Sequence, residues 1–396
     1  MTTAKRWLLP DGVEEILPAE AYRLESLRRD LLDLYESWGY ELVITPLIEY
    51  LDSLLVGSSQ DLDLHTFKIT DQLSGRMMGI RADITPQAAR IDAHCLNRQG
   101  PVRLCYADSV LHTKPRGIMT SRVPIRIGAE LYGHSGVECD IELVCLMHET
   151  LRRAGIDDLH IVLGHVGIFR SLVAAANLQV PTERSLFEAV QRKAFDQIDA
   201  VLDASVADPV LQNMLKKLAR LSGDESVIAE ALQAFADAPE SVRKELQDLV
   251  AIVEGVKRRI PDITLCFDLC ELRGYEYHTG IVFAAYTPAY GRAVAKGGRY
   301  DHIGEVFGRA RPASGFDSDL KTLAKLTSGE FRRPAAVLAP ASDDEALLQT
   351  VAELRAQGEV VINWLQESAA TAEQMQELGC DRKLVHNNGN WEIEAL

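Results

Sequence analysis

Residues 20–38 carry apolar positions at helical spacing. The leucines on this face are Leu24, Leu27, Leu31 and Leu34. Gly39 follows as a C-terminal stop, so the pattern predicts a long amphipathic helix. A strand is expected next, at residues 40–45, where β-branched residues cluster. Pro46 closes that strand because proline has no N–H to donate to a ladder.

Short β-rich runs predict further strands along the first two thirds of the chain. They are expected at residues 77–81, 102–107, 126–132, 160–163, 263–269 and 280–286. Asp140 can N-cap a helix that Gly155 ends, and a second helix is expected over about residues 318–327. Gly297 and Gly298 predict a glycine-rich turn. The order of these elements indicates an antiparallel sheet with helices.

The pattern changes to helices only between residues 168 and 260, which predicts a helical insertion between two parts of one sheet. Residues 333–396 then alternate between strand and helix patterns, as expected for a small α/β domain. The sequence therefore predicts an α+β protein. Its core spans residues 1–328 with an insertion at about 168–260, and a C-terminal α/β domain spans 333–396.

Composition places the chain among globular proteins and limits where it acts. It has 396 residues, of which 47% are apolar and 25% charged, so about two or three domains are expected. No run of eighteen apolar residues is long enough to cross a bilayer. The apolar run at the N-terminus is far too short for a secretory signal. A soluble cytoplasmic protein without membrane contact is predicted.

Charge and cysteine usage exclude two further classes. The net charge of −16 repels the phosphate backbone, so no nucleic-acid partner is expected. Seven cysteines, scattered between Cys95 and Cys380, suit a reducing compartment rather than a disulfide framework. Cys266 and Cys270 are four residues apart, but the second pair that a zinc site needs is missing. Neither a metal nor a cofactor is predicted.

Four segments resemble the histidyl-tRNA synthetases, a family of class II aminoacyl-tRNA synthetases. In chain order they read YELVITPLIE, GIRADITPQAAR, ELRGYEYHTG and KGGRYD, and LRGYEYHTG resembles the histidine-recognition motif of that family. The resemblance implies a class II synthetase-like antiparallel sheet core and a pocket for histidine. It also implies a dimer built around the segment that contains Pro46, although simple strand termination explains this proline too.

A histidine pocket needs an anion for the ammonium group, donors for the carboxylate and partners for the ring nitrogens. The residues that offer this set are Asp83, Thr85, Arg126, Glu130 and Arg273, with Tyr277 and His278 from the recognition motif. By resemblance, Asp83 stands where the family binds the α-ammonium group and Glu130 where a carboxylate receives the imidazole N–H. For Glu130 alone, a solvent-facing position on a strand remains an alternative.

Two positions depart from the synthetase pattern around this predicted pocket. Arg126 stands where the family has a glutamine near the substrate, and His278 replaces the tyrosine that closes the ring pocket. Arg273 and Tyr277 follow the pattern, although an arginine before a glycine is also common on protein surfaces. Weaker affinity or a different pose for histidine is therefore expected.

The residues that clamp ATP in a class II synthetase are missing. Adenylation needs arginines and a glutamate around the α-phosphate. By resemblance, Leu111 and Thr322 replace the two arginines, and Thr113 replaces the glutamate. Asp317 and Asp319 add negative charge near the expected triphosphate position, where they would repel ATP. No catalytic residue is predicted.

A synthetase-like chain with these losses resembles the regulatory subunits of ATP phosphoribosyltransferase. Its tail is also shorter and more acidic than the anticodon-binding domain of a histidyl-tRNA synthetase. The resemblance implies a short-form catalytic subunit as partner, a homodimer within a hetero-octamer of four regulatory and four catalytic chains, and feedback inhibition by L-histidine. The alternatives are a divergent histidyl-tRNA synthetase, a ligase that adenylates histidine or another acid, and a synthetase-like stress or kinase regulator.

Overall fold

The computed structural model describes residues 8–55, 60–115, 117, 120–329, 331, 333–366 and 368–396. The N-terminal run considered above as a secretory signal begins in residues 1–7, outside this part. The chain divides into two compact units, Met1–Gly329 and Glu330–Leu396. Within the described residues, no helix is long and apolar enough to span a membrane.

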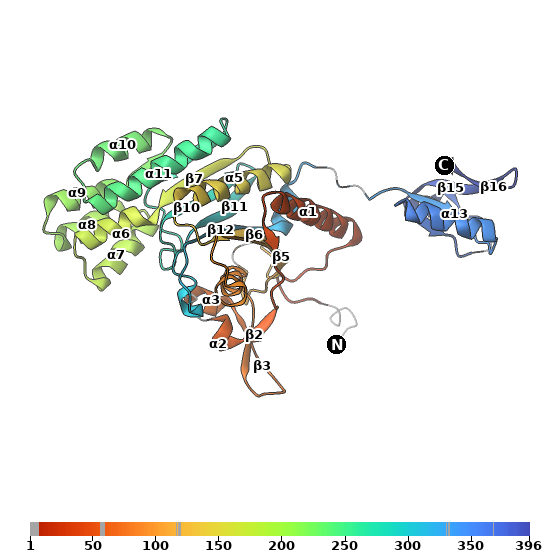
Figure 1. Cartoon of the computed structure of the whole chain (residues 1–396), viewed down its shortest axis with the longest axis horizontal. Coiled ribbons are helices and arrows are strands. Elements are labelled where there is room, and N and C mark those ends of the chain that lie inside the picture. The colour runs from red at the N-terminus through yellow and green to blue at the C-terminus, as the bar shows by residue number, and fades with distance from the viewer. Residues whose placement is uncertain are drawn as a thin grey trace. The chain divides into compact units, whose positions relative to one another are not determined.

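A nine-stranded sheet, as far as the described residues show, forms the centre of the larger unit (Figure 1). In spatial order its strands are β1 (Glu41–Leu42), β5 (Val102–Ser109), β6 (Ile125–Tyr132), β12 (Ala313–Asp319), β11 (Tyr290–Arg299), β10 (Ile281–Thr287), β7 (His160–His165), β9 (Thr264–Asp268) and β8 (Ser222–Gly223). The strands from β5 to β7 pair antiparallel, whereas β1 joins β5 and β9 joins β7 in parallel. The predicted class II-like antiparallel core is confirmed.

Three details of the predicted sheet are wrong. The strand expected at residues 40–45 is only β1, two residues long. The strand β4 (Met77–Ile80) belongs to a separate three-stranded sheet with β2 (Ile48–Tyr50) and β3 (Phe67–Thr70). Gly297 and Gly298 lie within strand β11 rather than in a turn. A Cβ on Gly297 would come within 2.3 Å of the Gly315 carbonyl oxygen, so glycine here permits close approach of two strands.

Helix α1 (Pro18–Ser37) packs against α5 (Val137–Arg153) and α12 (Leu320–Leu326), and all three helices contact the central sheet. Leu27 and Leu31 of α1 have no exposed surface. Tyr35 of the same helix makes an edge-to-face contact with Phe316 of strand β12, with 6.1 Å between the ring centroids. The apolar face of α1 is therefore buried within its own chain. These leucines are therefore not available to contact a second copy of the chain.

Helix α5 begins earlier than predicted. Its N-cap is Gly136, and Asp140 lies one turn inside the helix. The Asp140 carboxylate accepts hydrogen bonds from Arg299 at 2.8 Å and from Ser314 at 2.6 Å instead of capping the helix. Because both partners lie on strands far along the sequence, the helix start alone did not reveal this role.

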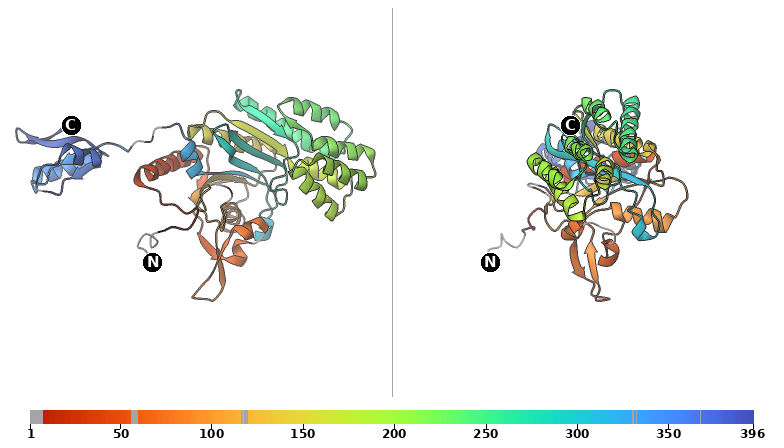
Figure 2. Two further views of the ribbon diagram at one scale, coloured as in Figure 1. Left: turned by 180° about the vertical axis from the view of Figure 1, so that it is seen from behind. Right: turned by 90° about the vertical axis from the view of Figure 1, so that its left-hand side faces the viewer.

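The segment between β7 and β9 is almost entirely helical, as predicted, except for the short strand β8. Its helices are α6 (Val166–Ala175), α7 (Val180–Gln191), α8 (Phe195–Ser205), α9 (Pro209–Leu218), α10 (Ser226–Ala234) and α11 (Glu240–Arg259). They gather beside β7 and β10, as the views from the front, back and side show (Figures 1 and 2). The insertion thus borders the end of the sheet where the LRGYEYHTG loop emerges.

In its described residues, the smaller unit consists of a four-stranded sheet and two helices. Its strand order is β14 (Val361–Asn363), β13 (Ala336–Ala339), β15 (Cys380–Asn387) and β16 (Asn390–Ala395), and its helices are α13 (Glu345–Ala356) and α14 (Ala372–Glu377). Val337, Leu347 and Val361 lie in its buried core. Thr371 caps α14 by a capping box with Gln374.

Candidate ligand-binding site

A cavity of about 940 Å³ opens on one face of the central sheet in the larger unit. Its floor includes a row of four residues that pair side by side across neighbouring strands: Val282, Gly298, Gly315 and Glu130. The glycines leave room for the side chains above them. A Cβ on Gly315 would lie 1.6 Å from Glu130 Oε2, and one on Gly298 would lie 2.6 Å from the His278 ring.

Glu130 is the most buried acidic group of the cavity wall, with 1% of its surface exposed. Its Oε1 accepts hydrogen bonds from the hydroxyl groups of Thr85 at 2.9 Å and Tyr106 at 3.0 Å. Burial raises the pKa of this carboxyl group well above its ordinary range, although the two hydrogen bonds oppose that effect. Glu130 therefore does not face solvent on an exposed strand.

The second oxygen of Glu130 and the hydroxyl group of Tyr300 are both buried, and neither has a hydrogen-bond partner among the described residues. Both atoms lie within 2.2 Å of the point where a Cβ on Gly315 would stand, so they are neighbours. Buried polar atoms in folded proteins are normally paired. This part of the cavity is therefore suited to a ligand that brings a polar N–H group.

Asp83 and Thr85 reach the same cavity from the start of helix α4 (Thr85–Arg90). Asp83 Oδ1 accepts hydrogen bonds from the backbone N–H groups of Ile84 at 2.7 Å and Thr85 at 3.3 Å. These contacts fix the carboxylate at the helix start. The arrangement places a second acidic group beside Glu130, as a bound ammonium group would need.

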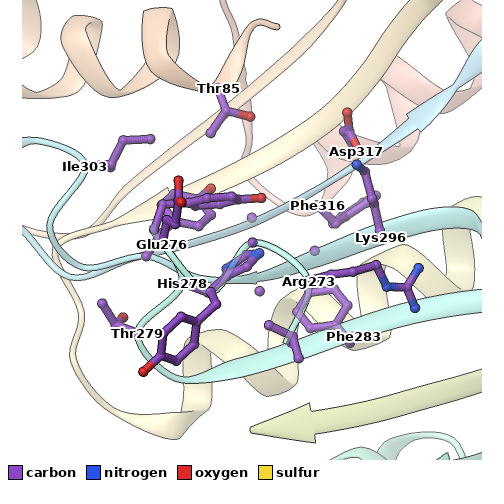
Figure 3. A pocket seen from close by; sticks show the side chains of 18 of the residues that line it. Thr85, Arg273, Glu276, His278, Thr279, Phe283, Lys296, Ile303, Phe316 and Asp317 are labelled. Carbon is purple, nitrogen blue, oxygen red and sulfur yellow. The ribbon is translucent and has the colours of Figure 1, made fainter. Parts of the chain in front are cut away.

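Arg126 is the one predicted site residue that does not line the cavity. Its guanidinium group instead approaches the carboxylate of Asp317 on the neighbouring strand, with 3.4 Å between Nη1 and Oδ2. Asp317 itself lines the cavity, and Lys296 from the next strand extends toward it (Figure 3). Strand register places Arg126 opposite Asp319, so its side chain reaches Asp317 diagonally across the two strands rather than the cavity.

His278 lies near the middle of the cavity and is 7% exposed (Figure 3). Its Nδ1–H donates to the backbone carbonyl of Arg299 at 3.1 Å, which leaves Nε2 as the acceptor nitrogen of the neutral ring. Burial lowers the pKa of His278 to about 4. Tyr277 stacks against this ring, with 4.2 Å between the centroids. The pair forms an aromatic wall that remains uncharged at neutral pH.

Arg273 lines the cavity but its guanidinium group points away from His278 (Figure 3). Its Nη2 donates to Glu271 at 2.7 Å and to the hydroxyl group of Tyr286 at 2.6 Å. Half of the Arg273 side chain is exposed. In this conformation Arg273 holds a position at the cavity rim.

Six of the seven residues expected from the sequence therefore line one cavity: Asp83, Thr85, Glu130, Arg273, Tyr277 and His278. The remaining lining residues were not predicted to bind a ligand, and three of them bear on the site. Tyr300 stands in the quoted KGGRYD segment, so the sequence carried a signal for it. Arg170 and Phe187 come from the helical insertion, where nothing in the pattern marks them.

Of the positions expected for ATP chemistry, Leu111, Thr113 and Thr322 do not line the cavity. Leu111 and Thr113 donate their backbone N–H groups to the carbonyl oxygens of Arg81 and His65. Thr322 donates its hydroxyl group to Asp319, which caps α12. The neighbouring Lys321 is only 6% exposed and pairs with Glu14 at 3.2 Å. Thr322 and Lys321 are thus engaged through their side chains, and Leu111 and Thr113 through their backbone.

The sheet, its covering helices and the cavity define a class II synthetase-like protein of the histidyl type. The family model described as histidyl-tRNA synthetase matches residues 12–323. Among solved structures, an ATP phosphoribosyltransferase regulatory subunit/histidyl-tRNA synthetase from Bacillus halodurans matches with a TM-score of 0.82 at 24% identity, over 95% of this chain and 97% of that one. A histidyl-tRNA synthetase from Nostoc matches with a TM-score of 0.77 at 20% identity, over 98% and 97%.

A second family model, the C-terminal domain of ATP phosphoribosyltransferase subunit HisZ, matches residues 334–394. The ATP phosphoribosyltransferase regulatory subunit of Ectopseudomonas mendocina is 54% identical over the full length of both chains. That of Alkalilimnicola ehrlichii is 53% identical over 99% of this chain and 98% of its own. The chain belongs to the family of ATP phosphoribosyltransferase regulatory subunits.

Proposed function

We propose that this chain binds L-histidine in the cavity and uses its occupancy to regulate a short-form ATP phosphoribosyltransferase catalytic subunit, the enzyme of the first step of histidine biosynthesis. The observation that carries the ligand assignment is the unpaired Glu130 oxygen beside the unpaired Tyr300 hydroxyl group. An imidazole N–H satisfies the carboxylate, and the hydroxyl group can turn to match either ring nitrogen.

The α-ammonium and carboxylate groups of histidine match the other charged residues of the cavity. Asp83 provides the anion for the α-ammonium group, with the hydroxyl group of Thr85 beside it. His278 and Tyr277, whose rings are tilted by 35° to each other, provide an aromatic wall for the ligand ring. Arg273 reaches the ligand carboxylate only if it leaves Glu271, and this competition fits the weaker affinity expected from the sequence.

The chain, on this proposal, has no catalytic site of its own. Leu111, Thr113 and Thr322 supply neither a positive charge nor a carboxylate where adenylation needs them, and an enzyme of this class depends on such groups to stabilise the developing phosphate charge. Arg126 lies in this region, but its charge is paired with that of Asp317. Regulation, not synthetase chemistry, is the activity that remains.

Assembly is part of the proposal. A homodimer within a hetero-octamer of four regulatory and four catalytic chains is expected, and the apolar segment around Pro46 offers a surface for the second copy. Ile44 is 79% exposed there, with Leu47 at 49% and Ile48 at 45%. All seven cysteines are free, which supports a reducing, cytoplasmic setting.

Calorimetric titration of L-histidine into the purified chain tests the ligand assignment. We expect one site per chain, and Glu130→Ala is expected to weaken binding at least about thirtyfold, since loss of a buried charged partner costs roughly 2–5 kcal/mol. Glu149→Ala, at an exposed position of α5, is the matched control. Equal affinities in the two variants would place the histidine site elsewhere.

A further inference from the structure

The loop that carries His278 is attached to the helical insertion as well as to the sheet. Arg170 of α6 donates Nη2 to the backbone carbonyl of Tyr275, and to that of His278 at 3.1 Å. Its guanidinium carbon also lies 4.4 Å from the centre of the Tyr275 ring. A single arginine thus holds two loop carbonyls and one loop side chain, so the loop and α6 are joined at three points.

A second connection runs from the loop to helix α7. The Tyr275 ring lies between Phe169 of α6, at 5.5 Å, and Phe187 of α7, at 5.2 Å between centroids. Its hydroxyl group donates a 2.7 Å hydrogen bond to Glu183 in the first turn of α7. Tyr275 therefore bridges both helices with its ring and fixes its orientation with its hydroxyl group.

His278 cannot move independently of this loop. Its ring fits between Gly274 and Gly298, where an added Cβ on either glycine would come within 2.6 Å of a ring carbon. Gly274 has a φ of +67°, which favours glycine in the tight turn that leads to His278. The backbone N–H of His278 donates to the Gly274 carbonyl at 2.8 Å. The ring, the turn and the two helices thus form one packed assembly.

We propose that Arg170, Tyr275 and Glu183 couple occupancy of the cavity to helices α6 and α7, with Arg170 as a positioning residue for His278. The inference rests on the proposed binding of histidine in this cavity. A ligand held against His278 fixes the loop, and the loop then fixes α7 through Tyr275. Because coupling is reciprocal, a partner that holds these helices in place also favours the ligand-bound form of the cavity.

Hydrogen exchange of the full chain, with and without saturating L-histidine, tests this coupling. In the unmodified chain we expect exchange within residues 180–191 to slow by about threefold or more on binding, because a rigidified element opens less often. Glu183→Ala is expected to bind histidine with an affinity within about threefold of the unmodified chain but to lose this slowing. Glu188→Ala, on the same helix and 55% exposed, is the matched control and is expected to keep it.

Arg170 variants test the positioning role separately. Arg170→Ala is expected to weaken histidine binding about tenfold, while Arg170→Lys, which keeps a cation over the Tyr275 ring, recovers part of that loss. Histidine binding without slower exchange in α7, equal slowing in Glu183→Ala and Glu188→Ala, or equal affinities in both Arg170 variants and the unmodified chain would overturn the coupling alone. A chain that binds no histidine would overturn the proposed function together with it.

Discussion

The hydroxyl group of Thr85, at the start of helix α4, donates a 2.9 Å hydrogen bond to Glu130 on strand β6. This bond joins two segments that the sequence separates and orients the buried carboxylate toward the cavity. Thr85→Val keeps the shape of the side chain and removes the donor. We expect histidine affinity to fall by about ten- to a hundred-and-fiftyfold, since hydrogen bonds to charged groups contribute roughly 1.5–3 kcal/mol. Calorimetry on the folded variant measures the loss, and an unchanged affinity would remove Thr85 from the site.

The pH dependence of stability should reveal the burial of Glu130. Burial raises the pKa of Glu130 in the folded chain above its pKa in the unfolded chain. The stabilising contribution of the protonated carboxyl group is therefore complete at pH values below the unfolded-state pKa. It is lost as the pH rises toward the folded-state pKa. Glu130→Gln has no titratable carboxyl group, so it avoids this loss of stability. We expect the melting temperature of the variant to rise relative to that of the unmodified chain as the pH increases from 5 to 8, an interval above the usual carboxyl pKa of about 4.3. A difference that stays constant across this interval would contradict the predicted titration.

The dimer is predicted to use the exposed segment around Pro46 instead of helix α1. Ile44→Asp replaces a side chain that is 79% exposed, so it should leave the melting temperature of the monomer almost unchanged while it converts dimers to monomers in sedimentation experiments. Leu365→Asp, at a 90% exposed position of the smaller unit, is the control and is expected to remain dimeric. If both variants dimerise with equal affinity, the interface lies elsewhere.

Leu27→Glu is expected to act on folding instead of assembly. Leu27 has no exposed surface within its own chain, so the variant buries a charge and should lose several kcal/mol of stability, roughly 3 kcal/mol or more. Chemical denaturation of the larger unit measures this loss. A stable Leu27→Glu monomer would contradict the burial of Leu27 within its own chain.

The chain is predicted to lack adenylation activity. Histidine-dependent exchange of pyrophosphate into ATP should stay at background, because Leu111 and Thr322 offer no positive charge to the phosphates. A histidyl-tRNA synthetase assayed in parallel provides the positive control. Exchange clearly above background would favour the working-enzyme alternatives.

The sequence alone predicted the parts of the fold that local patterns determine. Helix α1, the antiparallel strands and the helical insertion follow from periodicity. The family resemblance assigned His278 and Glu130 to one pocket, and both line the same cavity. What the sequence missed depends on contacts between distant segments. The Arg126 side chain points to Asp317, and Arg170 of helix α6 contacts the loop that carries His278. The spacing of neighbouring residues in the sequence does not determine where either side chain points.

Histidine inhibition of the complex with the catalytic subunit tests the central claim most directly. The measurement compares the histidine concentration that halves ATP phosphoribosyl transfer in complexes built from the unmodified chain, from Glu130→Ala and from the control Glu149→Ala. We expect all three complexes to assemble and to be active without histidine. Glu130→Ala should require at least about thirtyfold more histidine for half inhibition. If Glu130→Ala and the unmodified chain are inhibited at the same concentration, the cavity is not the histidine sensor.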